Sequence, residues 1–211
     1  MAAALHFRRA VADTSHVTPG DEFADVLAAA QRAEAWAVAS LWRTYQPALL
    51  RYLRGMCQDA CEDVASEVWL ECGGRMERFR GDEAAFRAWL FTNARRRAID
   101  HHRRAARSAL PVAELPERPS ADEAGWERAE ALEWALDRLR TLSPDQREVV
   151  LLRVVGGFDV DEVASLMGKQ PGTVRVLHHR AVKALAASLG GDRVTASGRR
   201  TFSEHGDGLA A

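Results

Sequence analysis

Aromatic residues are scarce in this chain: phenylalanine, tryptophan and tyrosine together make up 7% of its 211 residues. Long apolar runs are also missing, and a transmembrane helix needs about 18 or more consecutive apolar residues. Residues 1–30 lack the continuous apolar core of a signal peptide, and no segment shows the period of two that indicates a β-strand. Alanine, leucine, arginine and glutamate dominate instead, and all four favour helices. We therefore expect an all-α protein that works in the cytoplasm.

Catalytic and cofactor motifs are absent as well. The chain contains no Walker phosphate loop, no GxGxxG turn and no Ser/His/Asp arrangement, so we expect neither an enzyme nor a cofactor. Three cysteines, Cys57, Cys61 and Cys72, form no CxxC pair. We interpret them as packed thiols in a reducing compartment, with a metal or redox role for the first two as the alternative. The histidine pairs at 101–102 and 178–179 point about 100° apart on a helix and chelate poorly, so we expect no metal site.

Charge is plentiful but segregated along the chain. The net charge of −1 argues against a nucleic-acid partner only if the charges are evenly mixed. Residues 95–107 hold six arginines and one aspartate, a local net charge of +5, whereas residues 111–133 hold seven acids and two arginines, a local net charge of −5. Local fields matter more than the total. This pattern predicts DNA-facing modules on each side of an acidic segment that restrains them when the protein is free.

Residues 159–185 are typical of a DNA-binding helix-turn-helix. Asp159 or Asp161 can cap a short helix, and Gly168 supplies a turn with positive φ. A second helix follows, with four cationic residues and no acid between residues 169 and 183, which suits the major groove. A helical hairpin that packs on another protein is the alternative. The apolar positions expected to face the first helix are Val174, Ala181, Ala184 and Leu185.

Proline content and periodicity divide the chain into two predicted helical domains. Three prolines and little periodicity predict a flexible linker over residues 108–123. The expected divisions are a disordered N-terminus (1–21), a helical bundle (22–107), the linker (108–123), a helix-turn-helix domain (124–189) and a disordered tail (190–211). The helices expected in the bundle span about 22–32, 34–56 with Pro47 as a possible break, 61–74 and 84–107. In the second domain, the run Ser143-Pro144-Asp145-Gln146 marks a helix start.

Three stretches in this order resemble one family. They are CEDVASEVWLEC (61–72), FRGDEAAFRAWLFTNARRRAIDHHRR (79–104) and LSPDQREVVLLRVVGGFDVDEVASLMGKQPGTVRVLHHRA (142–181). Over residues 30–189 the chain is similar to the extracytoplasmic-function class of bacterial sigma-70-type factors. The resemblance implies a promoter-specificity subunit that binds the clamp helices and flap of core RNA polymerase and recognises the minus-ten and minus-thirty-five promoter elements. It also implies an anti-sigma factor as a candidate partner, and zinc in such systems belongs to some anti-sigma partners.

The resemblance assigns roles to each stretch. Core polymerase binding falls to Glu62, Asp63, Glu67 and Trp69, where a solvated acidic face is the alternative for the carboxylates. Capture of the opened minus-ten strand falls to Phe79, Arg80, Gly81, Asp82, Asn93, Arg96, Arg97, Asp100, Arg103 and Arg104. Recognition of the minus-thirty-five duplex falls to Lys169, Gln170, Thr173, Arg175, His179, Arg180 and Lys183.

The residue chemistry around positions 79–104 supports the same interpretation. A protein that opens DNA must hold single strands by cationic contacts and by platforms for unstacked bases. The loop at 79–82 offers an aromatic ring, a cation, a flexible backbone and a carboxylate, and by resemblance it holds a flipped base. We also expect six arginines over 95–107 to be too many for a helix that only packs on protein. An ordinary turn anchored by Phe79 is the alternative for the loop.

The chain departs from the family pattern in the second helix of the helix-turn-helix. The family commonly has arginine where Leu177 stands, leucine where His178 stands and often a base at Val182. The runner-up function is a free-standing helix-turn-helix regulator whose N-terminal half senses a ligand. Such a regulator needs no separate basic helix for single strands, and no dimerisation stripe is evident.

Overall fold

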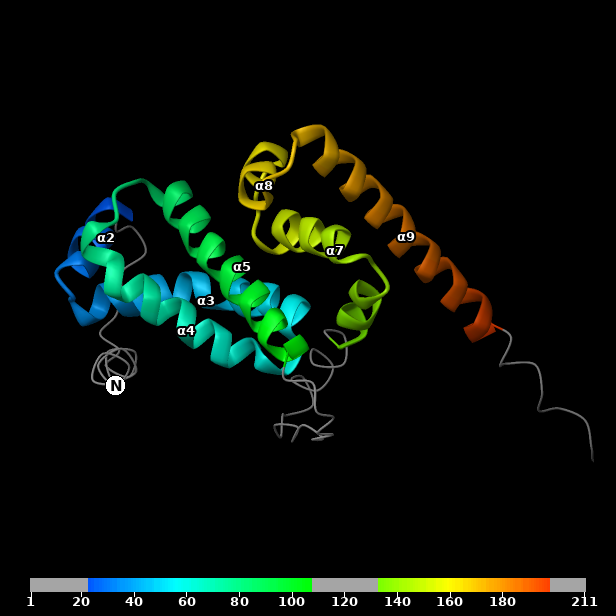
Figure 1. Cartoon of the computed structure of the whole chain (residues 1–211), viewed down its shortest axis with the longest axis horizontal. Helices are drawn as coiled ribbons and strands as arrows, with labels where there is room; N and C mark the ends of the chain where they lie inside the picture. Colours follow the sequence, from blue (N-terminus) through cyan, green and yellow to red (C-terminus); the bar gives the residue numbers. More distant parts are fainter. Residues whose placement is uncertain (1–22, 108–132, 198–211) are drawn as a thin grey trace, which may run out of the picture.

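The computed structural model describes residues 23–107 and 133–197. Every regular element in these ranges is helical (Figure 1), which confirms the predicted all-α class. The predicted N-terminus 1–21, the linker 108–123 and the part of the predicted tail 190–211 that follows residue 197 lie outside the described residues. We call residues 23–107 the N-terminal module and residues 133–197 the C-terminal module.

The N-terminal module is a bundle of four helices whose lengths follow the apolar periodicity. These are α2 (Phe23–Gln31), α3 (Ala35–Cys57), α4 (Cys61–Arg75) and α5 (Glu83–Arg107), with short 3-10 turns η1 (Gln58–Ala60) and η2 (Met76–Arg78). Pro47 lies inside α3 without ending it. The bundle is filled by an aromatic group in which Phe86 contacts Phe23, Tyr45 and Phe79, with ring centroids 5.2–5.7 Å apart.

Helix α4 runs past the glycine pair at which the sequence predicted its end. Gly73 and Gly74 lie within the helix, which continues to Arg75. Glycine weakens a helix by about 1 kcal/mol relative to alanine but does not forbid it. Cys72 and Met76 are buried on either side of the pair, so tertiary packing holds this last turn in place.

The C-terminal module begins with a helical segment over 133–140. The elements after it are α7 (Pro144–Val150), the π-helical turn η3 (Leu151–Val155), α8 (Val160–Met167) and α9 (Pro171–Ser197). Capping boxes start two of these helices as expected: Ser143 accepts from the backbone N–H of Gln146, and Asp159 accepts from Glu162. Gly168 adopts φ +63° and ψ +37° and ends α8 with the predicted left-handed turn.

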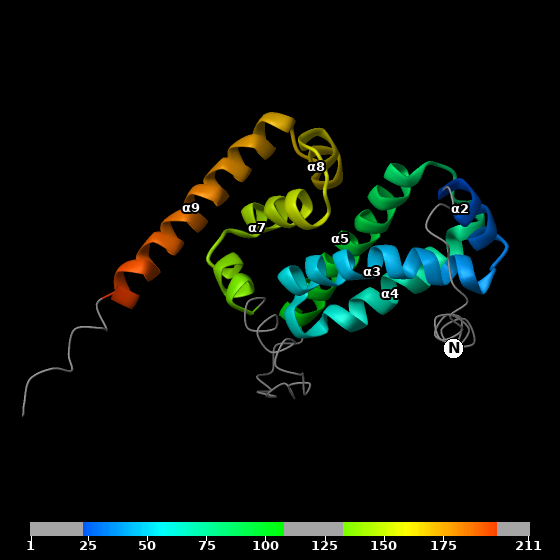
Figure 2. The same ribbon diagram turned by 180° about the vertical axis from the view of Figure 1, so that it is seen from behind.

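Helix α9 is longer than the sequence predicted. Its backbone is helical through Ser197, whereas a disordered tail was expected from residue 190. The glycines at 190 and 191 lower helix propensity, but they keep their backbone N–H and C=O groups, so the helix can continue through them. In Figures 1 and 2, the second half of α9 extends away from the rest of the molecule.

The two modules pack against each other through one continuous hydrophobic core. Phe158, in the turn before α8, contacts Phe91 of α5 edge-on at 5.2 Å. Leu151 of η3 lies over Gly55 of α3, where an added Cβ would come within 2.6 Å of its Cδ1. Both views show α7 and α8 alongside α3 and α5, while α4 lies on the far side (Figure 2). Sequence periodicity gives each helix an apolar face but does not say which module covers it, so it did not predict this contact.

Candidate nucleic-acid interface

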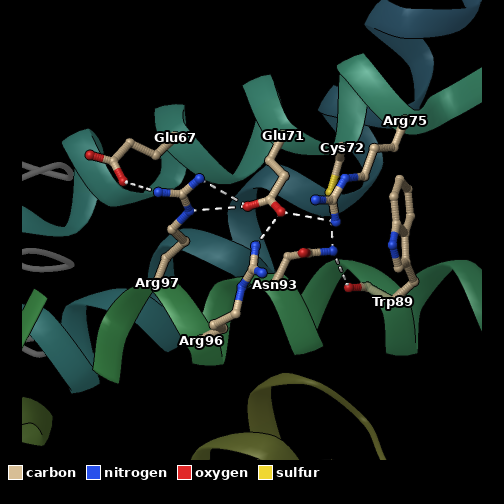
Figure 3. A network of polar contacts seen from close by, with 8 residues as sticks. All are labelled: Glu67, Glu71, Cys72, Arg75, Trp89, Asn93, Arg96 and Arg97. Atoms are coloured by element: carbon tan, nitrogen blue, oxygen red, sulfur yellow. Dashed lines mark hydrogen bonds and ion pairs between the residues drawn. The ribbon is translucent and has the colours of Figure 1, made fainter. Parts of the chain in front are cut away.

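The arginines of α5 meet carboxylates of α4 in a polar cluster shown in Figure 3. Arg97 donates to Glu67 at 3.1 Å and to Glu71 at 3.1 Å, and Arg96 also pairs with Glu71. Arg75 reaches the same Glu71 carboxylate at 3.1 Å. We call these five residues the Glu71 cluster. Arg96 and Arg97 of α5 join it to α4 through Glu71, while Arg75 pairs with Glu71 within α4, so these cations have a structural role before any ligand arrives.

Glu71 is the centre of that cluster, and its side chain is only 9% exposed. Burial by itself would raise the pKa of Glu71. The hydrogen bonds and positive charges of Arg96 and Arg97 outweigh burial and lower the pKa below its usual value. The carboxylate therefore stays ionised, and its charge-assisted bonds stay strong.

Two residues predicted to bind partners are instead core residues, and this corrects their assignment. Trp69 is 3% exposed and its indole N–H donates to Gln46 at 2.6 Å, so it is not a surface anchor for a partner protein. Asn93 is 5% exposed and its side-chain amide donates to the Trp89 carbonyl at 2.9 Å. Figure 3 shows the Asn93 side chain turned toward α4. In both cases the helix face is set by packing with α3 and α4.

Other cations of α5 are exposed to solvent near its C-terminal end. Arg103 and Arg104 are exposed, and Asp100 is half-buried with an oxygen 3.9 Å from Arg103. At that distance the pair is weak and leaves Arg103 available. The exposed part of the predicted single-strand surface is therefore smaller than six arginines suggested.

The loop 79–82 connects η2 to α5 and is held in place by several local contacts. Phe79 stacks on Trp89 with centroids 5.0 Å apart, and Arg80 donates to the backbone carbonyls of Glu77 and Phe79. Asp82 caps α5 by accepting from the backbone N–H of Ala85 at 2.8 Å. These contacts match the ordinary turn that was the alternative interpretation, and they also make the loop rigid.

A hollow of about 460 Å³ lies between this loop and α2. The loop forms one wall, and Phe23, Leu27 and Gln31 of α2 form the other. Gln31 joins the two walls because its side-chain amide donates to the Phe79 carbonyl at 2.9 Å. Apolar periodicity predicts helix α2 but does not connect it with the loop, because the two are nearly fifty residues apart in the chain.

Helix α4 presents a polar face with one apolar residue on it. Glu62 and Asp63 are exposed as predicted, and Glu67 is half-buried in the Glu71 cluster. Leu70, next to the buried Trp69, is 41% exposed. It lies three residues after Glu67, one helical turn along the same side. The family resemblance places the apolar anchor at Trp69, one position before this exposed residue.

Helix α9 carries a basic face that the described residues leave without acidic partners. Val174 and Ala181 are fully buried and Leu185 is half-buried, which fixes the packed side, although Ala184 is exposed. The opposite side is exposed along its length and carries Gln170, Thr173, Arg175, His179, Arg180 and Lys183.

Lys169 differs from the other predicted duplex contacts. It is half-buried, and its ammonium group lies 2.9 Å from the Asp145 carboxylate of α7. His178 sits at the edge of the packed side, where burial and then the nearby charge of Arg153 lower its pKa. It is therefore neutral near pH 7, unlike a phosphate-binding cation.

The three cysteines are buried free thiols. Burial raises the pKa of Cys57 and of Cys72 to about 12, so neither is a thiolate at neutral pH. Within residues 23–107 and 133–197, no group of three or more histidine, cysteine or acidic side chains is arranged to hold a metal ion. No helix in these same ranges combines the length and apolarity needed to cross a bilayer.

Comparisons with known proteins identify both modules. Residues 41–108 match the family model of sigma-70 region 2, and residues 132–185 match that of sigma-70 region 4. The chain is 34% identical over 190 residues to the ECF RNA polymerase sigma factor SigD of Mycobacterium tuberculosis, covering 85% of this chain and 87% of the relative. It is also 34% identical over 169 residues to the ECF RNA polymerase sigma factor ShbA of Streptomyces griseus, covering 73% and 88% respectively.

Solved structures share the fold. CnrH, in a complex with the cytosolic domain of CnrY, matches with a TM-score of 0.59 and 24% identity over 82% of this chain and 99% of that one. The sigma factor RpoE of Bartonella quintana, in a complex with the anti-sigma factor NepR, matches with a TM-score of 0.55 and 22% identity over 72% and 95%.

Proposed function

Because the chain belongs to the extracytoplasmic-function family of RNA polymerase sigma factors, it is a promoter-specificity subunit, and we propose that three separate faces divide its task. Helix α9 recognises the minus-thirty-five duplex, the loop and end of α5 hold the opened minus-ten strand, and α4 binds core polymerase. The acid-free basic face of α9 supports this most directly, because few other roles suit an uncompensated cationic helix after a helix-turn-helix turn. Its place of action is the cytoplasm, where chromosomal promoters lie.

The minus-thirty-five contact is made by exposed side chains at the start of α9. Gln170 directly precedes α9, and Thr173 and Arg175 lie in its first turns, where a recognition helix meets base edges. Arg180 and Lys183 follow along the same side, at positions suited to phosphates. Lys169 contacts the bases only after its ion pair with Asp145 breaks. While it remains paired, it can contact only a phosphate.

The minus-ten strand is held by a revised set of residues. A base pulled from the stack needs a pocket with apolar walls and hydrogen-bonding groups. The hollow between α2 and the loop 79–82 supplies both, with Phe23 and Leu27 as walls and Asp82 at its edge. Exposed Arg103 and Arg104 then hold the strand backbone. Arg96 and Arg97 reach DNA only by leaving Glu71, and buried Asn93 takes no part.

The pocket is tested by promoter opening. Asp82→Asn keeps an acceptor for the helix cap but removes the charge, while Leu27→Arg fills the hollow from the α2 wall. We expect Leu27→Arg to reduce permanganate reactivity of minus-ten thymines while closed-complex formation is retained. Ala24→Ser, a small change on the same wall, is the control. Normal opening by a folded Leu27→Arg protein contradicts the pocket.

Core polymerase binds the exposed side of α4. An apolar anchor surrounded by charged groups is the usual arrangement of a binding hot spot. Leu70 is that anchor, and Glu62 and Asp63 provide the charged rim. Glu67 contributes to polymerase binding only when its ion pair with Arg97 breaks. By family resemblance the polymerase surfaces are the clamp helices for this module and the flap for the C-terminal module.

An anti-sigma factor is proposed to bind a groove beside the C-terminal module. The groove has a volume of about 300 Å³ and is lined by apolar side chains that include Trp134, Val150, Val154 and Leu185, with Arg51 at its edge. Val154 is 72% exposed, which is unusual for a valine of its size next to a core. The partner expected there is an amphipathic helix with acidic flanks that complement the arginine. Of the two solved neighbours, CnrH was solved with the cytosolic domain of CnrY and RpoE with an anti-sigma factor. An anti-sigma factor is therefore the first class of partner to test.

The function as a whole is tested by transcription with purified core polymerase on a promoter carrying both elements. We expect specific transcripts only when this protein is added. A free-standing regulator, the alternative, would bind its DNA site but give no transcript with core polymerase alone.

A further inference from the structure

Helix α9 carries two exposed valines that have no part in the three proposed faces. Val176 and Val182 are each 49% exposed. Helix propensity does not account for them, because a β-branched valine loses rotamer freedom in a helix and favours it less than alanine does. Single exposed apolar residues are common on protein surfaces. The place of each valine on the helix therefore decides whether it has a function.

Val176 lies within the basic face of α9, on the side opposite the buried Val174. One stripe of exposed side chains runs along this face at intervals of three, four and three residues: Thr173, Val176, Arg180 and Lys183. Val176 is the apolar member of the stripe and belongs to the second turn of the helix. The N-terminal turns of a recognition helix are the part that contacts base edges. Val176 is therefore placed to meet a base and not only the DNA backbone.

The start of α9 has little side-chain bulk next to Val176. Gly172 lies one turn before it and is exposed, and a Cβ added there would meet no atom of the described residues within 4 Å. The φ of Gly172 lies outside the left-handed region. Neither packing nor backbone conformation therefore requires a glycine, which weakens a helix relative to alanine. A missing side chain at such a place allows a ligand to approach the backbone closely, which supports deep entry of this end of α9 into the groove.

The chemistry of the major groove identifies what an exposed valine can contact there. Base edges in this groove present hydrogen-bond donors and acceptors, and thymine adds an apolar C5-methyl group. A valine side chain neither donates nor accepts a hydrogen bond. We infer that Val176 contacts the C5-methyl group of a thymine in the minus-thirty-five element and is a specificity-determining residue of α9. This inference rests on the proposed recognition of that element by α9.

The valine contact adds a preference that the neighbouring cations do not supply. Arg180 and Lys183 are placed to hold phosphates, and phosphate contacts carry no sequence information directly. Val176 favours thymine over cytosine for two reasons. Cytosine lacks the methyl group, and its N4 amino group is a donor that would lose water against the valine without gaining an acceptor.

Val182 is the matched control for Val176. It is the same residue type on the same helix with the same exposed fraction. It lies six residues further along, which corresponds to about 9 Å of helix axis, and is therefore beyond the N-terminal turns that meet base edges. Alanine favours the helix more than valine does. Val176→Ala and Val182→Ala should therefore both fold as the parent protein does.

The contact is tested by removing one methyl group from the DNA and one side chain from the protein. The probe is a promoter duplex that holoenzyme, assembled from core polymerase and the full-length protein, recovers from a pool randomised over both promoter elements. Each thymine of its minus-thirty-five element is replaced singly by deoxyuracil, which lacks only the C5-methyl group. We expect one replacement to weaken holoenzyme binding by about threefold to tenfold, as for one buried methyl group. With Val176→Ala this loss should fall below about 1.5-fold, whereas Val182→Ala should keep it in full.

A second selection from the same pool uses holoenzyme with Val176→Ala. It should lose the preference for thymine at the sensitive position and keep the rest of the element. The valine contact is overturned if no replacement weakens binding, if Val176→Ala keeps the sensitivity or the preference, or if both valine variants lose the sensitivity equally. Recovery of no upstream element by the parent holoenzyme means that the proposed recognition by α9 fails, and the inference fails with it. A recovered element without methyl sensitivity leaves the proposed function intact and overturns the valine contact alone.

Discussion

The basic faces of α5 and α9 look alike in sequence but differ in what their cations do. On α5, Arg95, Arg96 and Arg97 all pair with carboxylates of neighbouring helices. On α9, Arg175, Arg180 and Lys183 are exposed, and no acid among the described residues pairs with them. A run of arginines in the sequence therefore shows the local charge but not whether these side chains are free to bind DNA. These three arginines of α5 therefore pair within the protein, contrary to the expectation that six arginines are too many for a helix that only packs on protein.

The sharpest way to break this comparison is to remove the carboxylate at the centre of the Glu71 cluster. Glu71→Ala leaves Arg75, Arg96 and Arg97 crowded together without their shared partner. We expect a loss of about 2–4 kcal/mol in the free energy of unfolding, measured by urea titration. Glu62→Ala, an exposed glutamate on the same helix, is the control and should change it by about 0.5 kcal/mol or less. Equal effects would falsify the structural role of the cluster.

The opposite behaviour is expected on α9, where function and not stability depends on the arginines. Arg175→Ala and Arg180→Ala should each weaken binding to the minus-thirty-five duplex by about 1–3 kcal/mol while the urea midpoint stays unchanged. Arg140→Ala, an exposed arginine outside α9, is the control. Fluorescence anisotropy at several salt concentrations should also show a shallower salt dependence for the variants. Unchanged binding by both variants would mean that another face meets the duplex.

A smaller effect is expected on α4, where we propose that Leu70, the exposed neighbour of the buried Trp69, is the anchor for core polymerase. Leu70→Ala should weaken core polymerase binding by about 1 kcal/mol, with little change in stability. Trp69→Phe is the comparison, since it removes the hydrogen bond to Gln46 inside the core. That variant should lower stability and leave polymerase affinity per folded molecule unchanged. The reverse result would return the anchor to Trp69.

The smallest expected effect is a loss of stability at acidic pH. The pKa of Glu71 is lower in the folded protein than in the unfolded chain, where a glutamate titrates near about 4.3. Its contribution to stability is therefore present above about pH 4.3 and is lost as the pH falls through the folded value. The difference in unfolding free energy between the parent protein and Glu71→Gln should shrink from pH 7 toward pH 3.5. A constant difference would show that Glu71 titrates normally.

Local sequence determined most of the helices and their ends. Ser143 and Asp159 start helices because their side chains accept from free backbone N–H groups, and Gly168 ends one because it adopts positive φ without strain. The packed side of α9 follows from the spacing of Val174 and Ala181 alone. These features depend on residues within one or two turns of each other, which is why periodicity and capping rules predicted them.

Tertiary structure decided which of the predicted faces are available. Trp69 is buried against Gln46 of α3, and its neighbour Leu70 is left exposed as a possible contact for a partner. The hollow beside the loop 79–82 depends on α2, and the contact between the two modules includes Glu148 meeting Arg95 across more than fifty residues of chain. Charge pairing of this kind is set by distances between helices, and no local pattern encodes those distances. The sequence by itself determined the helices and the family of this protein, whereas the fold decided which of its charges remain for DNA.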